Sequence, residues 1–208
     1  MDYNYIFFDC ESNSGRSHAD ILTISALFVD KNFKLIEEFN CAARLRKSRI
    51  YEIDSFLVNG MDPFEVDKHP FSNFDLTKKT NDKFISWINK GPVLFCAHNG
   101  YQFDYMLTST HLFTNLFTWP WIFSTGNAKQ IDSLPILQNF DFYAPNTIAV
   151  ELNEKSNKTF KLGSLCRMNG FDLGDKAHTA EADTLGMNKL MELVSKKNPE
   201  LFKKCISL

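Results

Sequence analysis

The strongest constraint on this chain is its first segment, YNYIFFDCES (residues 3–12), where a run of large apolar side chains ends on two acids. The apolar residues fall on both faces of a β-strand, which predicts a central strand covered on both sides. Alternate residues of a strand share a face, so Asp9 and Glu11 point the same way while Cys10 points to the opposite face. Two carboxylates held together at the end of a buried strand repel each other. They must share a proton, find cationic partners or bind a metal ion.

Length and net charge exclude few classes of protein. At 208 residues, the chain is expected to form one domain, residues 1–208, with a full hydrophobic core. The formal net charge of −2 produces no general attraction to nucleic acid, although a local basic groove is compatible with it. The sequence shows no secretory leader and no apolar run near the roughly 20 residues that a membrane-spanning helix needs.

The cysteines indicate a reducing environment. None of the five forms a CxxC pair, and several lie in apolar runs. This pattern favours buried thiols over disulfides or zinc ligands, so we expect a cytoplasmic, intracellular protein.

The remaining pattern predicts an α/β fold. Strands are expected at 21–29, 33–39, 93–97 and 130–132, and helices at 81–89, 101–117, 163–168 and 179–196. The first two of these strands form an antiparallel hairpin, whereas the third strand and the helix after it resemble a βα unit. Asp132 or Ser133 is the expected N-cap of a helix that follows the last strand. The segment 41–80 is less regular, and residues 147–162 are compatible with a polar-tipped hairpin.

A third acid lies at the start of a helix. In AHNGYQFDYM, Asp104 is about one turn into the helix after a buried strand, where α/β folds usually keep their sites. A carboxylate at this position also has a local explanation, because it complements the positive end of the helix dipole.

A fourth acid lies in KAHTAEAD, at the start of the last long helix. Thr179 and Glu181 suit a helix start and need no catalytic role. Asp183 lies at the edge of an inward apolar stripe. The spacing predicts that this stripe consists of Ala182, Leu185, Gly186, Leu190 and Leu193. His178 comes just before the helix, where its side chain can turn toward Asp183, although a single loop histidine is more often structural or solvated.

Together these acids form an ordered set from distant segments: Asp9, Glu11, Asp104 and Asp183. Four carboxylates suit two hard divalent cations, Mg²⁺ or Mn²⁺, which prefer oxygen ligands and leave positions open for phosphate oxygens and water. Two ions about 4 Å apart can activate a water and stabilise the departing oxygen during attack on a phosphodiester. Such a reaction also needs a base that titrates near neutral pH, and His178 is the candidate.

Three segments, FFDCES, AHNGYQFDYM and AHTAEAD, resemble the motifs of the DEDDh 3′-to-5′ exonucleases, and the resemblance spans nearly the whole chain. It is strongest with the nuclease domain of the bacterial exonuclease I branch, through LVNGMDP and KTFKLGSLCRMNG. The resemblance implies a ribonuclease H-like fold with a central five-stranded mixed sheet flanked by helices. It also implies that the four acids are metal ligands, that Glu11 and His178 are catalytic, and that His178 is the general base.

The same resemblance implies an enzyme that releases nucleoside 5′-monophosphates from the 3′ end of single-stranded nucleic acid, with DNA favoured over RNA. Ser12, Asn99 and Phe103 are the expected neighbours of the terminal nucleotide. Ser12 stands where many relatives have threonine, but the expected backbone contact to the sugar tolerates either residue. Phe103 is equally compatible with plain helix core.

Other interpretations stay open at this stage. The basic run RLRKSR, residues 44–49, either grips the phosphates of the strand or forms a solvated loop. The same acids would serve a phosphohydrolase or oligonucleotidase that acts on dinucleotides or very short RNA. A non-catalytic nucleic-acid-binding module on the same scaffold is a further alternative, although such modules usually lack at least one motif acid.

Overall fold

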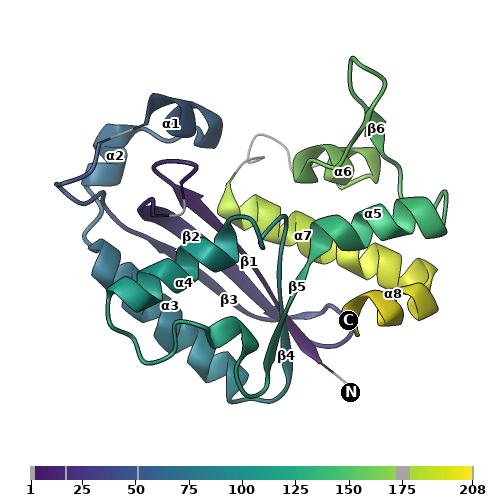
Figure 1. Cartoon of the computed structure of the whole chain (residues 1–208), viewed down its shortest axis with the longest axis horizontal. Coiled ribbons are helices and arrows are strands. Elements are labelled where there is room, and N and C mark those ends of the chain that lie inside the picture. The colour runs from purple at the N-terminus through teal and green to yellow at the C-terminus, as the bar shows by residue number, and fades with distance from the viewer. Residues whose placement is uncertain (1–2, 17, 51, 172–178, 208) are drawn as a thin grey trace.

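The computed structural model describes residues 3–16, 18–50, 52–171 and 179–207, which build one main sheet with helices on both faces (Figure 1). Its strands are β1 (Asn4–Ser12), β2 (Ile21–Val29), β3 (Leu35–Ala42), β4 (Val93–Ala97) and β5 (Ala128–Asp132). The helices are α1 (Ile53–Asn59), α2 (Pro63–Asp67), α3 (Asn73–Ile88), α4 (Asp104–Thr114), α5 (Ser133–Tyr143), α6 (Leu162–Met168), α7 (Ala180–Lys197) and α8 (Pro199–Ile206). A short 3-10 helix, η1 (Ile122–Ser124), and a small hairpin of β6 (Glu151–Leu152) and β7 (Lys158–Thr159) complete the described elements.

The main sheet is mixed and has the strand order β3-β2-β1-β4-β5. β1 pairs antiparallel with β2 and parallel with β4. The predicted α/β class and the five-stranded mixed sheet flanked by helices are therefore confirmed. β1 is central because it is apolar on both faces, and Ile6, Phe7 and Phe8 are fully buried.

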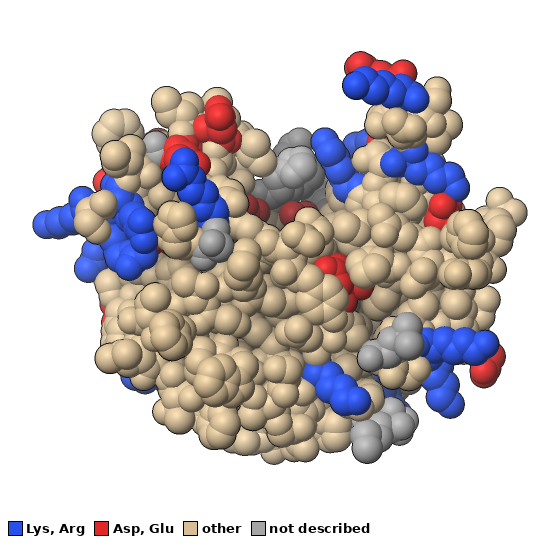
Figure 2. All heavy atoms as spheres, in the orientation of Figure 1, with Lys and Arg blue, Asp and Glu red and all other residues tan. Residues whose placement is uncertain are grey.

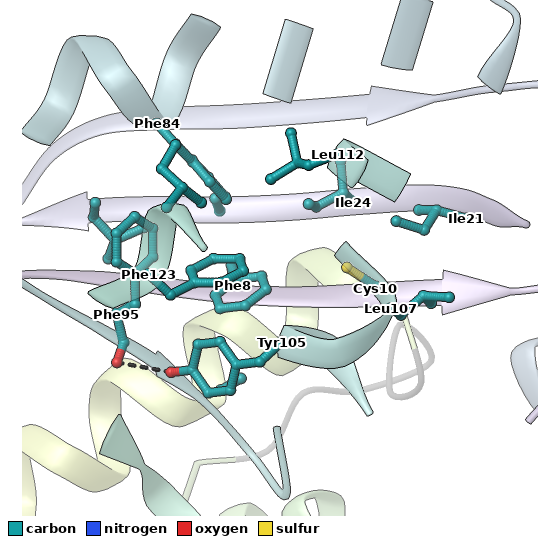
Figure 3. Packing of buried hydrophobic residues seen from close by; sticks show 14 of the residues in the cluster. Phe8, Cys10, Ile21, Ile24, Phe84, Phe95, Tyr105, Leu107, Leu112 and Phe123 are labelled. Carbon is teal, nitrogen blue, oxygen red and sulfur yellow. Dashed lines mark hydrogen bonds between the residues drawn. The ribbon is translucent and has the colours of Figure 1, made fainter. Parts of the chain in front are cut away.

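Alternate residues of β1 build a separate core on each face of the sheet. On one face Phe8 lies among rings contributed by α3, β4, α4 and η1 (Figure 3): Phe84, Phe95, Tyr105 and Phe123. On the other face Phe7 packs in the core formed with α5, α6, α7 and α8. Because Asp9 and Glu11 continue the alternation on the Phe7 side, they face the layer that contains α7.

Several boundaries differ from the prediction, and the start of α3 is set by a polar capping pair rather than by apolar periodicity. The helix expected at 81–89 is α3, which begins at Asn73. There the Asp75 N–H donates to Ser72 Oγ (3.2 Å) and the Ser72 N–H donates to Asp75 Oδ2 (2.8 Å), which makes a capping box. The helix expected at 101–117 is α4, which is shorter at both ends. The prediction lacks α1, α2 and α8, which have too few residues for a clear apolar period.

Other predicted elements are confirmed. Strands 21–29 and 93–97 coincide with β2 and β4, and the polar-tipped hairpin is present as β6 and β7. Asp132 is the N-cap of α5, where its carboxylate accepts a hydrogen bond from the Leu134 N–H at 2.9 Å.

The inward stripe predicted for α7 was wrong at one position. Leu185 is 43% exposed, whereas its neighbours Thr184 and Gly186 are buried. The Thr184 hydroxyl lies 3.3 Å from Ser25 Oγ of β2, so this edge of α7 packs on the sheet and Leu185 points outward. The buried side of α7 consists mainly of Met187, Leu190, Met191 and Val194, so Leu185 falls outside it.

All five cysteines are free thiols, and four of them are buried. This confirms the prediction of buried thiols without disulfides. Among the described residues, we find no helix with the length and hydropathy that a bilayer-spanning segment requires.

Phe8 offers a test of this packing. Replacing Phe8 by alanine should lower the free energy of unfolding by about 3–5 kcal/mol, because it leaves a cavity among four rings. Phe142 is 75% exposed, so Phe142→Ala is a matched control that should change stability by less than about 0.5 kcal/mol. Urea unfolding followed by circular dichroism measures both, and equal effects would contradict the packing described.

Candidate metal centre

The acidic end of β1 extends beyond its parallel neighbour. Asn4 to Phe7 pair with β4, whereas Asp9 and Glu11 lie past that ladder and pair with Ser25 and Thr23 of β2. Since β4 ends first, another element can approach β1 on this side. The start of α4 takes that place.

Asp104 is brought to β1 by the first turn of α4. Its carboxylate accepts a hydrogen bond from the backbone N–H of Cys10 at 3.0 Å, and the residue is only 3% exposed. This bond satisfies a donor that lies beyond the β4 ladder. The helix-dipole explanation for Asp104 is therefore incomplete, because the carboxylate also bonds a strand that is 94 residues away in sequence.

The turn between β4 and α4 is held by Asp132, a residue that the sequence analysis assigned only to a helix cap. Besides capping α5, the Asp132 carboxylate accepts hydrogen bonds from the N–H groups of Asn99 (2.8 Å) and Tyr101 (3.1 Å). These bonds hold Asn99 in a left-handed conformation with φ of 59°. Asp132 is the last residue of β5, opposite the end of β4 that leads to Asp104. Its place at a strand end was the sequence signal that could have identified this role.

Asp183 comes from the first turn of α7 and faces the same strand end. The Thr179 hydroxyl caps this helix by accepting from the Ala182 N–H at 3.3 Å, as predicted. Asp9, Glu11 and Asp183 each offer a carboxylate oxygen, and these oxygens all lie within 4.8 Å of one another. Oxygen-only ligands at this spacing fit a hard divalent cation such as Mg²⁺ or Mn²⁺.

All four predicted acids line one open hollow of about 330 Å³, together with His98, Asn99 and Phe103. Asp104 lies outside the tight group of three oxygens but within the same hollow. Figure 2 shows acidic atoms recessed between the lobe that carries α1 and α2 and the lobe that carries α6 and the small hairpin. The structure thus brings together acids from three distant segments of the chain.

Burial and mutual repulsion raise the pKa values of the clustered carboxyl groups. Burial is the largest cause for Asp9, whose pKa lies well above its ordinary value, and the charges of the other three acids follow. Burial and then the charges of Asp183 and Asp104 raise the pKa of Glu11 to about 8. Burial raises the pKa of Asp104 to about 7, although the Cys10 N–H stabilises its charged form. Such a cluster retains protons near neutral pH unless cations neutralise it.

Of the other predicted site residues, Asn99 and Phe103 line the same hollow, and Ser12 lines an adjoining one. Ser12 is buried, and its hydroxyl donates to the Ser14 carbonyl at 2.7 Å. Phe103 packs against the core, as the helix-core interpretation expects, and it also lines the hollow. Its contact with the terminal nucleotide stays a prediction. His178 lies outside the described residues.

The basic run at residues 44–49 is engaged within the protein. Arg46 and Arg49 form salt bridges with the buried carboxylate of Asp20. Arg44 donates to the Pro70 carbonyl at 2.6 Å. These arginines contact neighbouring loops, while Arg44, Arg46 and Lys47 stay exposed, as the solvated-loop interpretation expects. The phosphate grip stays a prediction.

Comparison with known proteins bears on both sequence and fold. We find no family model that matches the chain. The chain is 26% identical to exodeoxyribonuclease I of Buchnera aphidicola subsp. Schizaphis graminum (strain Sg) over 206 residues, which are 97% of this chain and 41% of that protein. It superposes on E. coli exonuclease I in complex with a dA16 oligonucleotide with a TM-score of 0.89 and 19% identity, over 97% of this chain and 42% of that one. It superposes on exonuclease I from Methylocaldum szegediense with a TM-score of 0.87 and 18% identity, over 99% of this chain and 43% of that one.

The fold is thus that of the matching part of the exonuclease I structures, a five-stranded mixed sheet flanked by helices. The particular proteins that the chain resembles, in sequence and in fold, are exonucleases I. The chain spans less than half the length of these relatives.

The raised pKa values predict how metal-free stability depends on pH. The folded acids hold protons that the unfolded chain releases above about pH 4, so their stabilising contribution is lost as pH rises through the folded values. In chelator, the melting temperature should fall between about pH 5 and pH 8.5, and it should fall less in Asp9→Asn. Mg²⁺ or Mn²⁺ should raise it, more strongly at the higher pH.

Differential scanning calorimetry with and without the cation measures this response. Asp82→Asn, which removes an exposed acid of α3, is the control and should behave as the wild type. Equal cation responses in the wild type and Asp9→Asn would contradict the assignment of Asp9 as a ligand.

Proposed function

We propose that this chain is a divalent-cation-dependent 3′-to-5′ exonuclease that acts on single-stranded DNA and releases nucleoside 5′-monophosphates. The observation that carries the proposal is the convergence of three carboxylates, from Asp9, Glu11 and Asp183, with Asp104 in the same hollow. The similarity to exonucleases I supports the same chemistry. Residues 1–208 would act as a single exonuclease domain, in a cytoplasm that keeps its thiols reduced.

The four acids are the proposed ligands of two divalent cations, Mg²⁺ or Mn²⁺. When bound, the cations supply positive charge that stabilises developing negative charge on the phosphate oxygens. The protein contributes preorganisation, since Asp104 is held by Cys10 and α7 is held against β2 through Thr184. This arrangement holds carboxylate oxygens at ligand spacing before any substrate arrives, and bound cations would displace the protons that the cluster otherwise retains.

The proposed reaction is hydrolysis of the last phosphodiester. A water oxygen attacks the phosphorus, the bond to the O3′ of the preceding nucleotide breaks, and the shortened strand keeps a new 3′-hydroxyl. His178 is the proposed general base that removes the proton of the attacking water. Its place just before α7, five residues before Asp183, is the sequence feature that supports this role. Glu11 is proposed to act beside it as a ligand and catalytic residue.

The terminal nucleotide is proposed to bind between the turn after β4 and the end of α1. Ser12 and Phe103 line a hollow of about 290 Å³, and Asn99 and Phe103 line the adjoining hollow that contains the acids. A space of this kind admits a frayed or single-stranded end but not a paired one. The choice of single-stranded DNA as the proposed substrate is supported by exonuclease I structures that contain dA16 and dT13 oligonucleotides.

The experiment that tests this function is a time course on single-stranded, blunt and 3′-recessed substrates labelled at the 5′ end, in DNA and RNA. A ladder that shortens from the 3′ end of single-stranded DNA, and that stops on chelation, is the expected result. Cleavage confined to dinucleotides would favour the small-substrate phosphohydrolase, and binding without cleavage would favour the non-catalytic module.

Asp104→Asn separates the ligand role from the structural role of this residue. The amide oxygen can still accept the Cys10 N–H, so the fold should persist while the negative charge is lost. We expect the rate to fall by about 100-fold or more, by analogy with the removal of one electrostatic group from an active site. Asp82→Asn is the matched control, and a normal rate in Asp104→Asn would remove Asp104 from the ligand set.

His178→Ala tests the proposed base. The rate should fall by about 100-fold or more, which is the usual contribution of general base catalysis. An unchanged rate in the variant would exclude His178 from this role, whatever the behaviour of Asp104→Asn.

A further inference from the structure

His98 is the one histidine that lines the acid hollow among the residues that the structure describes. It directly follows β4 and begins the turn that leads to Asp104. A histidine beside clustered acids is ordinarily a candidate for proton transfer. The hydrogen bonds of His98 indicate a different role.

Both ring nitrogens of His98 are bonded to other parts of the protein. Nε2 lies 2.8 Å from the Phe160 carbonyl oxygen, and Nδ1 lies 2.9 Å from Ser133 Oγ. A carbonyl oxygen can only accept, so Nε2 carries a hydrogen and donates it. Burial lowers the pKa of His98 and favours the neutral ring, so Nδ1 accepts from the Ser133 hydroxyl. Neither nitrogen is therefore left to take a proton from water.

The bond to Ser133 joins the turn after β4 to the start of α5. Ser133 is fully buried and is the first residue of α5. It directly follows Asp132, whose carboxylate accepts from two backbone N–H groups of the same turn. One helix start thus holds the turn through both a side chain of the turn and its backbone, and this turn sets the direction from which Asp104 approaches β1.

The bond to Phe160 joins the same turn to α6. Phe160 lies between β7 and α6, and its ring packs against the core on the α7 side of the sheet. α6 in turn packs against α7 (Figure 1). Cys166 of α6 is close enough to Asp183 that the charge of this acid, after burial, helps to raise the pKa of the thiol to about 12. His98 therefore connects the turn that carries Asp104 to the pair of helices that carries Asp183.

We propose that His98 is a positioning residue that holds the Asp104 side and the Asp183 side of the metal centre at a fixed separation. The inference rests on the two-cation exonuclease proposed above and adds a residue to it. Asp104 lies outside the group of three acids whose oxygens are within 4.8 Å of one another, so the two sides are distinct. Their separation decides the spacing of the two cations. Partners of this kind, behind the ligands themselves, orient the ligands and tune metal affinity.

Electron paramagnetic resonance of bound Mn²⁺ tests the proposal without substrate. Two Mn²⁺ ions about 4 Å apart, the spacing of two-metal sites, couple their electron spins, and the coupling weakens as the ions separate. The wild type should show a coupled pair at two equivalents of Mn²⁺. His98→Leu removes both ring bonds, so it should lose the coupled signal and bind the second ion about tenfold more weakly.

Three further variants separate positioning from general stability, and circular dichroism checks that each is folded. His98→Gln can still donate to the Phe160 carbonyl and should recover most of the coupled signal. Ser133→Ala keeps the imidazole and its bond to Phe160, so it should lose only part of the signal. His69→Leu is the control, since His69 follows α2 and does not line the acid hollow, and it should match the wild type.

The kinetic effect should be confined to turnover. Because both ring nitrogens bond to the protein, His98→Leu should lower kcat about tenfold and change KM for a single-stranded oligonucleotide by less than about twofold. An unchanged coupled signal, or an unchanged kcat, in folded His98→Leu would overturn the positioning role and leave the exonuclease function standing. A wild-type protein that binds no coupled pair would instead overturn the two-cation centre itself, so the two failures are distinguishable.

Discussion

The repulsion among four carboxylates in a partly desolvated hollow is the constraint on which this structure depends. Burial alone disfavours ionised Asp9, Glu11 and Asp104, and each acid raises the pKa of its neighbours. A protein gains no stability from such an arrangement without a cationic partner. The surrounding framework must therefore be stable enough to hold the acids together, and the two aromatic cores on either side of β1 provide that stability.

The topology explains how acids from distant segments meet. β1 is longer than β4, so its acidic end lies beyond the parallel ladder, where the first turn of α4 can place Asp104 against Cys10. Asp132 holds the intervening turn, and contact of α7 with β2 directs Asp183 toward the same point. The same register carries the sheet face from Glu11 to Thr23 and Ala42.

Features set by local alternation could be predicted from the sequence, and features set by tertiary contacts could not. The two-residue period of residues 3–12 was sufficient to place Asp9 and Glu11 on one face of a central strand. The start of α3 was missed because it depends on the capping pair Ser72 and Asp75 rather than on apolar spacing. Leu185 was misplaced because the buried side of α7 passes through Met187, Met191 and Val194, which the predicted stripe did not contain.

The central claim is that the carboxylates at the end of β1 hold divalent cations. The most direct measurement is a crystal structure of the wild-type protein grown with Mn²⁺, with anomalous scattering recorded to locate the metal. The account predicts anomalous peaks within bonding distance of carboxylate oxygens of Asp9, Glu11 and Asp183. Ordered Mn²⁺ elsewhere on the protein, with none at these three carboxylates, would contradict it.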